Sequence, residues 1–205
     1  MGLLALLLWL KSEYRNQYTL HTGPDGNCVL VPNPPTTSGG VPYTGYVLST
    51  ECDSSYGNDV GCAFLDTTNT SFGQGFNMVG GGVFAHLWNS SGIQMWHFVR
   101  DSIPKNIQKG RPDPSSWPPP VAFWSSQGCD FPSNLYDHHL VINTAVGGGW
   151  TSIDYPNSGC PANCSEQITI GKNFLSVFLF FSAHRAVLIE RPDAKWVINY
   201  IAVYE

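Results

Sequence analysis

The sequence predicts an all-β protein made of short strands and many loops, and three observations support this prediction. Only 12% of the 205 residues are charged. The chain also contains 21 glycines and 15 prolines, which form turns and interrupt helices. Two runs of alternating residues surround Asn89-Ser90-Ser91-Gly92, as in a β-hairpin. A chain of this length can bury one substantial core, and we expect one domain.

The predicted hairpin, residues 76–100, has two interpretations. Each run has one mainly aliphatic face and one face that mixes aromatic rings with polar groups. The mixed faces carry Phe84, His86 and Trp88 in the first run, and Gln94, Trp96, Phe98 and Arg100 in the second. In a sheet with one open face, these rings would line a groove that stacks on sugars. In a two-sheet sandwich the same rings are core, and the hairpin alone does not decide between the two.

The other elements follow from alternation and from turn residues. Strands are expected at residues 16–22, 43–50, 62–65, 138–144 and 198–204. Residues 174–181 form the most apolar run after the N-terminus. The prolines within residues 101–128 exclude a regular helix and a central strand. We therefore expect a long shaped loop there, of the kind that often borders a functional site.

The cysteines predict disulfides in an oxidising compartment. All six lie in loops rich in glycine, proline and serine, without the paired C-x-x-C spacing of a zinc site. They are Cys28, Cys52, Cys62, Cys129, Cys160 and Cys164. Six cysteines can form three bridges in about 15 different connectivities, and the sequence does not choose among them. Three N-x-S/T acceptors for glycosylation, at Asn69, Asn89 and Asn163, agree with a secretory route.

The N-terminus is atypical for a signal peptide. Residues 1–10 are almost entirely apolar, but no positive charge precedes them and no small-residue cleavage site follows. The run is also shorter than the roughly 20 residues that span a bilayer. It is a degenerate signal, a segment that touches a membrane, or a replacement for a missing part of the protein. The formal charge of −5 gives no basic surface, so we expect a neutral or small partner and no nucleic acid.

Catalytic groups are harder to identify. Glycoside hydrolysis needs two carboxyl groups about 5 Å apart for retention of configuration. Glu51 and Asp53 flank a cysteine and indicate a disulfide-tied loop, and residues 190–193 read as a solvated turn. His138 and His139 are adjacent, so on a strand they face opposite ways and cannot share a metal. No Ser-His-Asp or Cys-His arrangement stands out, and we expect no cofactor.

An ordered series of landmarks resembles a known family. The series comprises Asn16-Gln-Tyr-Thr-Leu-His-Thr22, Cys28, Thr50-Glu-Cys52-Asp, Gly61-Cys62, Phe76-Asn-x-x-Gly-Gly-Gly82, Ile93-x-x-Trp96-x-Phe98-x-Arg100, Pro104-x-Asn-Ile107, Trp117-Pro, Cys129-Asp130, His139-x-Val-Ile-Asn143, Gly148-x-Trp150, Gly159-Cys160-x-x-x-Cys164 and Trp196-x-Ile-Asn-Tyr-x-x-Val-Tyr204. The order closely resembles fungal glycoside hydrolase family 16, especially secreted endo-1,3(4)-β-glucanases of the laminarinase type. The resemblance covers residues 16–165 and 195–204.

This resemblance implies a concanavalin A-like β-jelly-roll sandwich whose concave sheet forms a β-glucan groove. It also implies hydrolysis of O-glycosyl bonds by a retaining double displacement. The family's two catalytic glutamates lie in an E-x-D-x-x-E motif just upstream of the strand that matches residues 16–22. These 205 residues contain no such motif, so no catalytic residue is assigned and the sandwich is expected to be incomplete.

Three departures from the family pattern shape the domain prediction. Residues 1–15 are an atypical apolar segment, and residues 16–205 are the family-like domain, a C-terminal portion of the fold. Within it, residues 168–195 fit the family poorly. The loop that reads Phe-Cys-Gly-Asp-Trp in relatives is Val146-Gly-Gly-Gly-Trp150 here, so a family cysteine is missing. A retained intron or a faulty gene model would explain both odd segments, and sequencing the mature transcript tests this hypothesis.

The resemblance implies substrate-contact roles for some residues of this chain, but no catalytic role. His21 is expected near the cleavage site, although a buried, hydrogen-bonded histidine is an equal alternative. Trp150 is expected to stack on a sugar ring. Trp96 and Asn143 are further candidates, each with a structural role as its alternative. The prediction is a secreted, monomeric family 16 protein that acts on a β-glucan polysaccharide or oligosaccharide and is catalytically impaired in this form. The alternatives are a non-catalytic β-glucan-binding module and an unstable fragment.

Overall fold

The computed structural model describes residues 15–23, 26–34, 42–54, 61–142, 156 and 197–204. The chain divides into two compact units, Met1–His138 and His139–Glu205, and each is considered by itself. The elements of the first unit are β1 (Gln17–Leu20), β2 (Tyr46–Ser49), β3 (Cys62–Leu65), α1 (Gly73–Met78), β4 (Gly82–Asn89), β5 (Gly92–Val99), η1 (Arg100–Ser102), α2 (Lys105–Gln108), η2 (Pro114–Ser116), β6 (Ala122–Ser125) and α3 (Phe131–Asn134).

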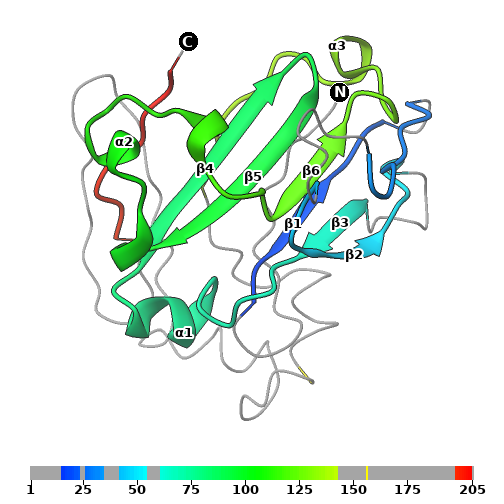
Figure 1. Cartoon of the computed structure of the whole chain (residues 1–205). Coiled ribbons are helices and arrows are strands. Elements are labelled where there is room, and N and C mark those ends of the chain that lie inside the picture. Colours follow the sequence, from blue (N-terminus) through cyan, green and yellow to red (C-terminus); the bar gives the residue numbers. More distant parts are fainter. Residues whose placement is uncertain are drawn as a thin grey trace. The chain divides into compact units, whose positions relative to one another are not determined.

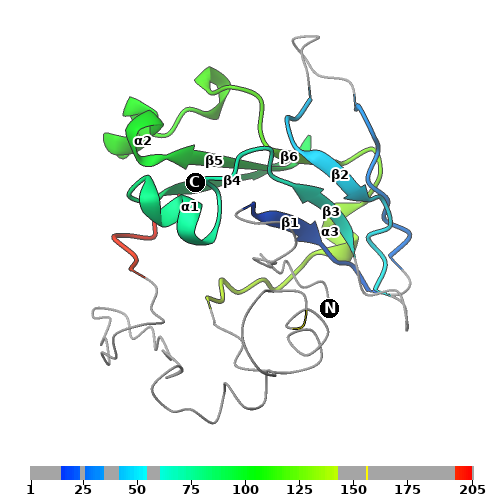
Figure 2. The same ribbon diagram turned by 90° about the horizontal axis from the view of Figure 1, so that it is seen from below.

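Among the described residues, six strands form two antiparallel sheets of three strands each (Figures 1 and 2). One sheet has the order β1-β3-β2 and the other the order β4-β5-β6. The pairing of β2 with β3 shifts register between Val47 and Ser49, as at a β-bulge. The all-β prediction is confirmed, because the described helices are short and lie in the connections.

The main core lies between the two sheets of the first unit. Tyr18, Leu20 and Phe64 reach it from the first sheet, while Ile93 and Trp124 reach it from the second. The rings of Phe64 and Trp124 pack edge to face with centroids 5.2 Å apart. The indole N–H of Trp124 donates to a backbone carbonyl of β3, 3.2 Å away, so hydrogen bonding as well as apolar burial joins the sheets. This is the packing of a β-sandwich.

A second core covers the opposite face of β5. Trp96, Phe98 and Ile107 are buried there, and the half-buried Trp117 packs against them. The indole N–H of Trp96 donates to the carbonyl of Pro118 at 2.8 Å. The segment that follows β5 therefore covers this face. Its apolar side chains pack against the aromatic residues of the strand, and its Pro118 carbonyl accepts the hydrogen bond of Trp96.

The strand register decides between the two interpretations of the hairpin. Cross-strand partners share a face, and Phe84 pairs with His97 while Ala85 pairs with Trp96. The aromatic residues of one run therefore lie on the same face as the aliphatic residues of the other. Both faces of β5 pack on a core, so the core interpretation is confirmed and the alternative of a sugar-stacking face is wrong. The turn Asn89-Ser90-Ser91-Gly92 was predicted correctly.

Three strand expectations need correction. Residues 101–128 were expected to form a loop without a regular helix or a central strand, yet they contain the short helix α2 and the strand β6, which pairs with β5 at the edge of the described sheet. The proline argument holds only as far as Pro120, and from Val121 onward every backbone N–H can bond, beginning with Val121 N to Met95 O at 2.8 Å. Conversely, the described residues 138–142 and 197–204 carry no strand. The remaining parts of the odd segments, 1–14 and 168–195, and the apolar run 174–181 lie outside the described residues.

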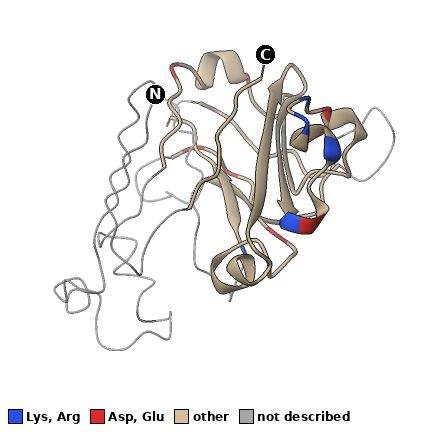
Figure 3. Cartoon of the chain, turned by 90° about the vertical axis from the view of Figure 1, so that its left-hand side faces the viewer, with Lys and Arg blue, Asp and Glu red and all other residues tan. Residues whose placement is uncertain are grey.

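The described surface carries few charged side chains, and most of its lysines and arginines lie in and around η1 and α2 (Figure 3). Such a sparse distribution fits a neutral partner better than a polyanion. No helix among the described residues is long and apolar enough to cross a membrane.

Candidate functional site

His21, the first predicted contact residue, lies immediately after β1 and is 8% exposed. The pairing of Leu20 with Cys62 fixes the end of β1 against β3. On the other side of His21, the backbone N–H of Thr22 donates to the carbonyl of Cys52 at 2.8 Å. The backbone of His21 is therefore held between two anchors, and the burial of the residue favours the alternative of a buried histidine.

The imidazole of His21 packs directly on the backbone of Gly61. A Cβ atom added to Gly61 would lie 2.7 Å from both Cε1 and Nδ1 of the ring. Gly61 also has a φ of +69°, a conformation that side chains other than glycine rarely adopt. Both observations favour glycine at position 61.

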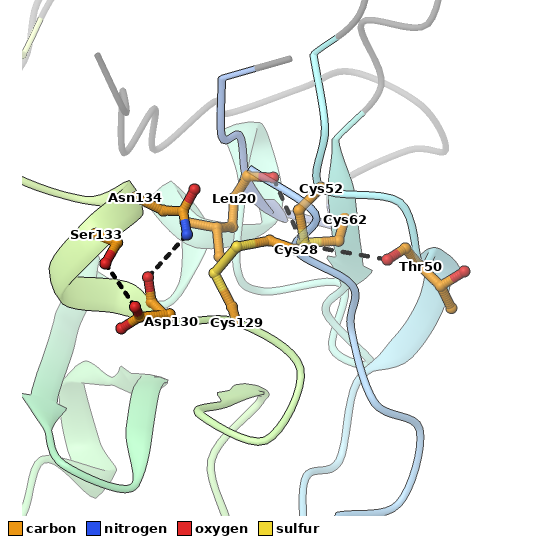
Figure 4. Close-up of a disulfide and its surroundings, with 9 residues drawn as sticks. All are labelled: Leu20, Cys28, Thr50, Cys52, Cys62, Cys129, Asp130, Ser133 and Asn134. Atoms are coloured by element: carbon orange, nitrogen blue, oxygen red, sulfur yellow. Dashed lines mark hydrogen bonds between the residues drawn. A yellow bond between two sulfur atoms is a disulfide. The ribbon is translucent and has the colours of Figure 1, made fainter. Parts of the chain in front are cut away.

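Two disulfides surround this region (Figure 4). Cys52 is bonded to Cys62, which joins the segment after β2 to the beginning of β3. Cys28 is bonded to Cys129 across 101 positions of the sequence. The first bridge places Glu51 and Asp53 in the disulfide-tied loop that their spacing indicated. Cys160 and Cys164 lie outside the described residues.

A polar cluster anchors the beginning of β1 inside the core. Asp66 is 0% exposed, and its carboxylate accepts hydrogen bonds from the Tyr18 hydroxyl at 2.9 Å and from the N–H and hydroxyl of Thr68 at 2.8 Å each. His97 Nδ1 lies 3.6 Å from the same carboxylate. In addition, the Asp66 N–H donates to the carbonyl of Asn16 at 2.8 Å. We call Tyr18, Asp66, Thr68 and His97 the Asp66 cluster.

Burial sets the protonation states of Tyr18 and His97. Desolvation, and then the negative charge of Asp66, raise the pKa of Tyr18 well above its ordinary value of 10.0. Its hydroxyl therefore keeps the proton that it donates to Asp66. Desolvation also lowers the pKa of His97 from 6.5, and this effect outweighs the opposing attraction of Asp66. The ring of His97 stacks on Phe84 with centroids 5.1 Å apart, which agrees with a neutral, buried imidazole.

The lowered pKa of His97 predicts a loss of stability in mild acid. The unfolded chain binds a proton at His97 near pH 6.5, whereas the folded chain binds it only at lower pH. Between these two pKa values the unfolded state holds more protons, so the free energy of unfolding falls as the pH is lowered below about 6.5. Urea denaturation across this range should show the fall, and His97→Gln should remove part of it. An unchanged slope in the variant would contradict the assignment.

The structure does not bring the predicted contact residues together. Trp96 lies in the second core, on the opposite face of β5 from the side chains that pack toward β1. Its burial to 3% exposure and its bond to Pro118 favour the structural alternative. Trp150 and Asn143 lie outside the described residues. The sugar contacts of all these residues stay predictions.

Sequence reasoning missed the Asp66 cluster. One signal was available, because His97 interrupts the aliphatic face of its run and a polar side chain there needs a buried partner. Asp66 follows a buried strand, but nothing in the sequence connects it to Tyr18, 48 positions earlier. Tyr18, Asp66 and the His97 side chain are closed to solvent, so the cluster supports the fold rather than contacting a ligand. Within the described ranges, no three His, Cys, Asp or Glu side chains converge into a metal site.

Comparison with known proteins identifies the sequence family. Residues 9–204 match the XgeA-like catalytic domain of glycoside hydrolase family 16. A probable glycosidase of Schizosaccharomyces pombe is 33% identical over 193 residues, which cover 93% of this chain and 40% of that protein. An endo-1,3(4)-β-glucanase of Arthroderma benhamiae is 30% identical over 212 residues, which cover 100% of this chain and 41% of that protein. The chain thus spans less than half the length of these two relatives.

Solved structures agree with this match. Laminarinase 16A from Phanerochaete chrysosporium, determined with β-glucans in its donor and acceptor sites, has a TM-score of 0.65 and 30% sequence identity. The similarity covers 75% of this chain and 50% of that one. A family 16 β-1,3-glucosyltransferase has a TM-score of 0.51 and 31% identity, covering 62% of this chain and 39% of that one. The expected jelly-roll sandwich is thereby confirmed, and the chain belongs to glycoside hydrolase family 16.

Proposed function

We propose that this chain acts on β-1,3(4)-glucans as part of a secreted family 16 glycosidase, with residues 16–205 as the family-like domain. The match of residues 9–204 to the family's catalytic domain is the observation that carries this proposal. A laminarinase of similar fold holds β-glucans in donor and acceptor sites. The two disulfides of the described part support an oxidising, extracellular location.

Within this function, His21 and Trp150 are the proposed glucan contacts. His21 is fixed by β1, by Gly61 and by the Cys52–Cys62 bridge, so it can hold one orientation toward a sugar. Trp150 offers a ring on which the C–H face of a sugar can stack. Trp96 is proposed to act indirectly, by supporting β5, and Asn143 is a further candidate contact.

The catalytic step of the family is not assigned to any residue of this chain. Retaining hydrolysis needs a carboxylate nucleophile and a carboxyl acid/base, and the 205 residues contain no E-x-D-x-x-E. We therefore propose that this chain, expressed alone, binds β-glucan without cutting it. This non-catalytic binding activity is the second candidate function beside hydrolysis by the whole protein.

Laminarin separates these functions. The purified 205-residue chain should migrate more slowly in a gel that contains laminarin and should release no reducing sugar from it. Trp150→Ala should weaken the retardation about fivefold, because one sugar-aromatic stack contributes roughly 1 kcal/mol. Trp117→Phe is a matched control, since Trp117 packs against the second core.

Each outcome has a distinct meaning. Release of reducing sugar by the purified chain would overturn the non-catalytic proposal. Unretarded migration of a chain that unfolds cooperatively in urea would overturn β-glucan binding. The absence of cooperative unfolding would instead establish an unstable fragment.

A further inference from the structure

The tip of the β4–β5 hairpin presents an asparagine in a favourable position for modification. Asn89 ends β4, and Ser90 and Ser91 form the two-residue turn before β5. All three side chains are exposed. Asn89 and Ser90 also line an open hollow together with Gln127 and Gly128.

The local hydrogen bonds leave the amide nitrogen of Asn89 available. The Oδ1 atom of Asn89 accepts from the backbone N–H of Ser91 at 2.9 Å and from its hydroxyl at 2.6 Å. Because a backbone N–H can only donate, the atom facing it must be the oxygen of the amide. The Nδ2 atom therefore points away, and no bond from it to another described residue is present. The Ser91 hydroxyl, which completes the N-x-S acceptor triplet, is hydrogen-bonded to the side chain of Asn89 itself.

We propose that Asn89 is an N-glycosylation site of this protein. The donor is an oligosaccharide linked through pyrophosphate to a lipid. Asn89 Nδ2 forms a bond to the anomeric carbon of the first N-acetylglucosamine, the bond from that carbon to the pyrophosphate oxygen breaks, and the lipid pyrophosphate leaves. The amide loses one proton, so the reaction needs no oxidant or reductant.

Asn69, the other described acceptor, is a poorer site in the folded chain. Asn69 itself is exposed, but Ser71 of the same triplet is 1% exposed. The Ser71 hydroxyl accepts from the N–H of Asn16 at 2.9 Å and donates to the carbonyl of Thr68 at 2.9 Å. Once β1 has docked, a transferase that reads this hydroxyl finds it buried and held by two hydrogen bonds, whereas the Ser91 hydroxyl is exposed and has only its local bond to Asn89. The transferase can therefore use Asn69 only before the chain folds, whereas it can use Asn89 both before and after folding.

The proposal is tested by secretion of the full chain from yeast behind a secretion leader. Peptide mapping after enzymatic glycan release in heavy-oxygen water marks each occupied asparagine. Asn89 should be labelled, and its glycan should be lost completely in Asn89→Gln and in Ser91→Ala. Ser90→Ala is the matched control, because it changes the turn but not the acceptor pair, and it should keep the glycan. The result is independent of glucan binding, which the laminarin gel measures separately.

Delayed folding distinguishes the two acceptors. Dithiothreitol during expression keeps the Cys28–Cys129 and Cys52–Cys62 bridges open and prolongs the unfolded state. Occupancy at Asn69 should then rise, while occupancy at Asn89 should stay unchanged. An unmodified Asn89 in the secreted chain would overturn the proposal. An Asn69 as fully occupied as Asn89 without reductant would contradict the protective effect of the Ser71 contacts.

Discussion

Removal of the Cys28–Cys129 disulfide is expected to lower the free energy of unfolding by about 4.7 kcal/mol, the value for a closed loop of roughly 100 residues. The two cysteines are 101 positions apart in the sequence, and both are buried in the main core. A bridge of this span removes a large amount of conformational entropy from the unfolded chain. This loss is comparable to the whole stability of many domains, so the double variant Cys28→Ala/Cys129→Ala should be largely unfolded at 37 °C.

The second bridge provides a matched control. Cys52 and Cys62 are as buried as the first pair but only 10 positions apart. Their removal in Cys52→Ala/Cys62→Ala should cost less, about 3 kcal/mol, because the closed loop is short. Both variants vacate similar volumes in the core, so the difference between them isolates the effect of loop length.

Urea denaturation of the oxidised wild type and the two double variants measures these losses. The variant without the long bridge should also show a steeper dependence on urea, since its unfolded state exposes more surface. Equal losses in the two variants would contradict the entropic explanation. They would indicate that residual structure already holds Cys28 near Cys129 in the unfolded chain.

The positions of most strands could be predicted because alternation and turn residues are local signals. Residues 16–22 and 62–65 were expected to be strands, and they contain β1 and β3. The hairpin turn at Asn89 was also evident. The sequence did not show which side of the sheet each aromatic residue faces, because this depends on how the two strands pair, and neither run alone reveals that pairing. Within each run, most of the aromatic residues lie on one face. The pairing of Ala85 with Trp96 shows that the aromatic faces of the two runs lie on opposite sides of the sheet.

The candidate site shows the same division between local and distant information. The resemblance to family 16 indicated His21, and the glycine before Cys62 was part of that pattern. The reason for this glycine is a contact between residues 40 positions apart, which only the structure reveals. The Asp66 cluster likewise joins β1, the end of β3 and β5. Contacts at such separations leave no periodic signal in a single sequence.

Replacement of Asp66 by alanine is the second large expected effect, a loss of about 3 kcal/mol in the free energy of unfolding. Tyr18 is 0% exposed, so its hydroxyl would lose its acceptor without gaining water, at a cost of about 1–3 kcal/mol. Hydrogen bonds to a charged group contribute about 1.5–3 kcal/mol each, and the bonds from Thr68 would also disappear. Thr68 is exposed and can bond to water instead, which limits the total.

A double-mutant cycle with Tyr18→Phe distinguishes the lost hydrogen bond from a general disturbance. Tyr18→Phe removes the donor and leaves no unsatisfied hydroxyl, so the loss from Asp66→Ala should be smaller in that background by about 1–2 kcal/mol. Thr68→Val is the control for the exposed side of the cluster and should cost less than either single change. Additive losses from Tyr18→Phe and Asp66→Ala would show that the buried bond contributes nothing specific. The cycle therefore tests whether the Asp66 cluster fixes β1, the strand that leads to His21.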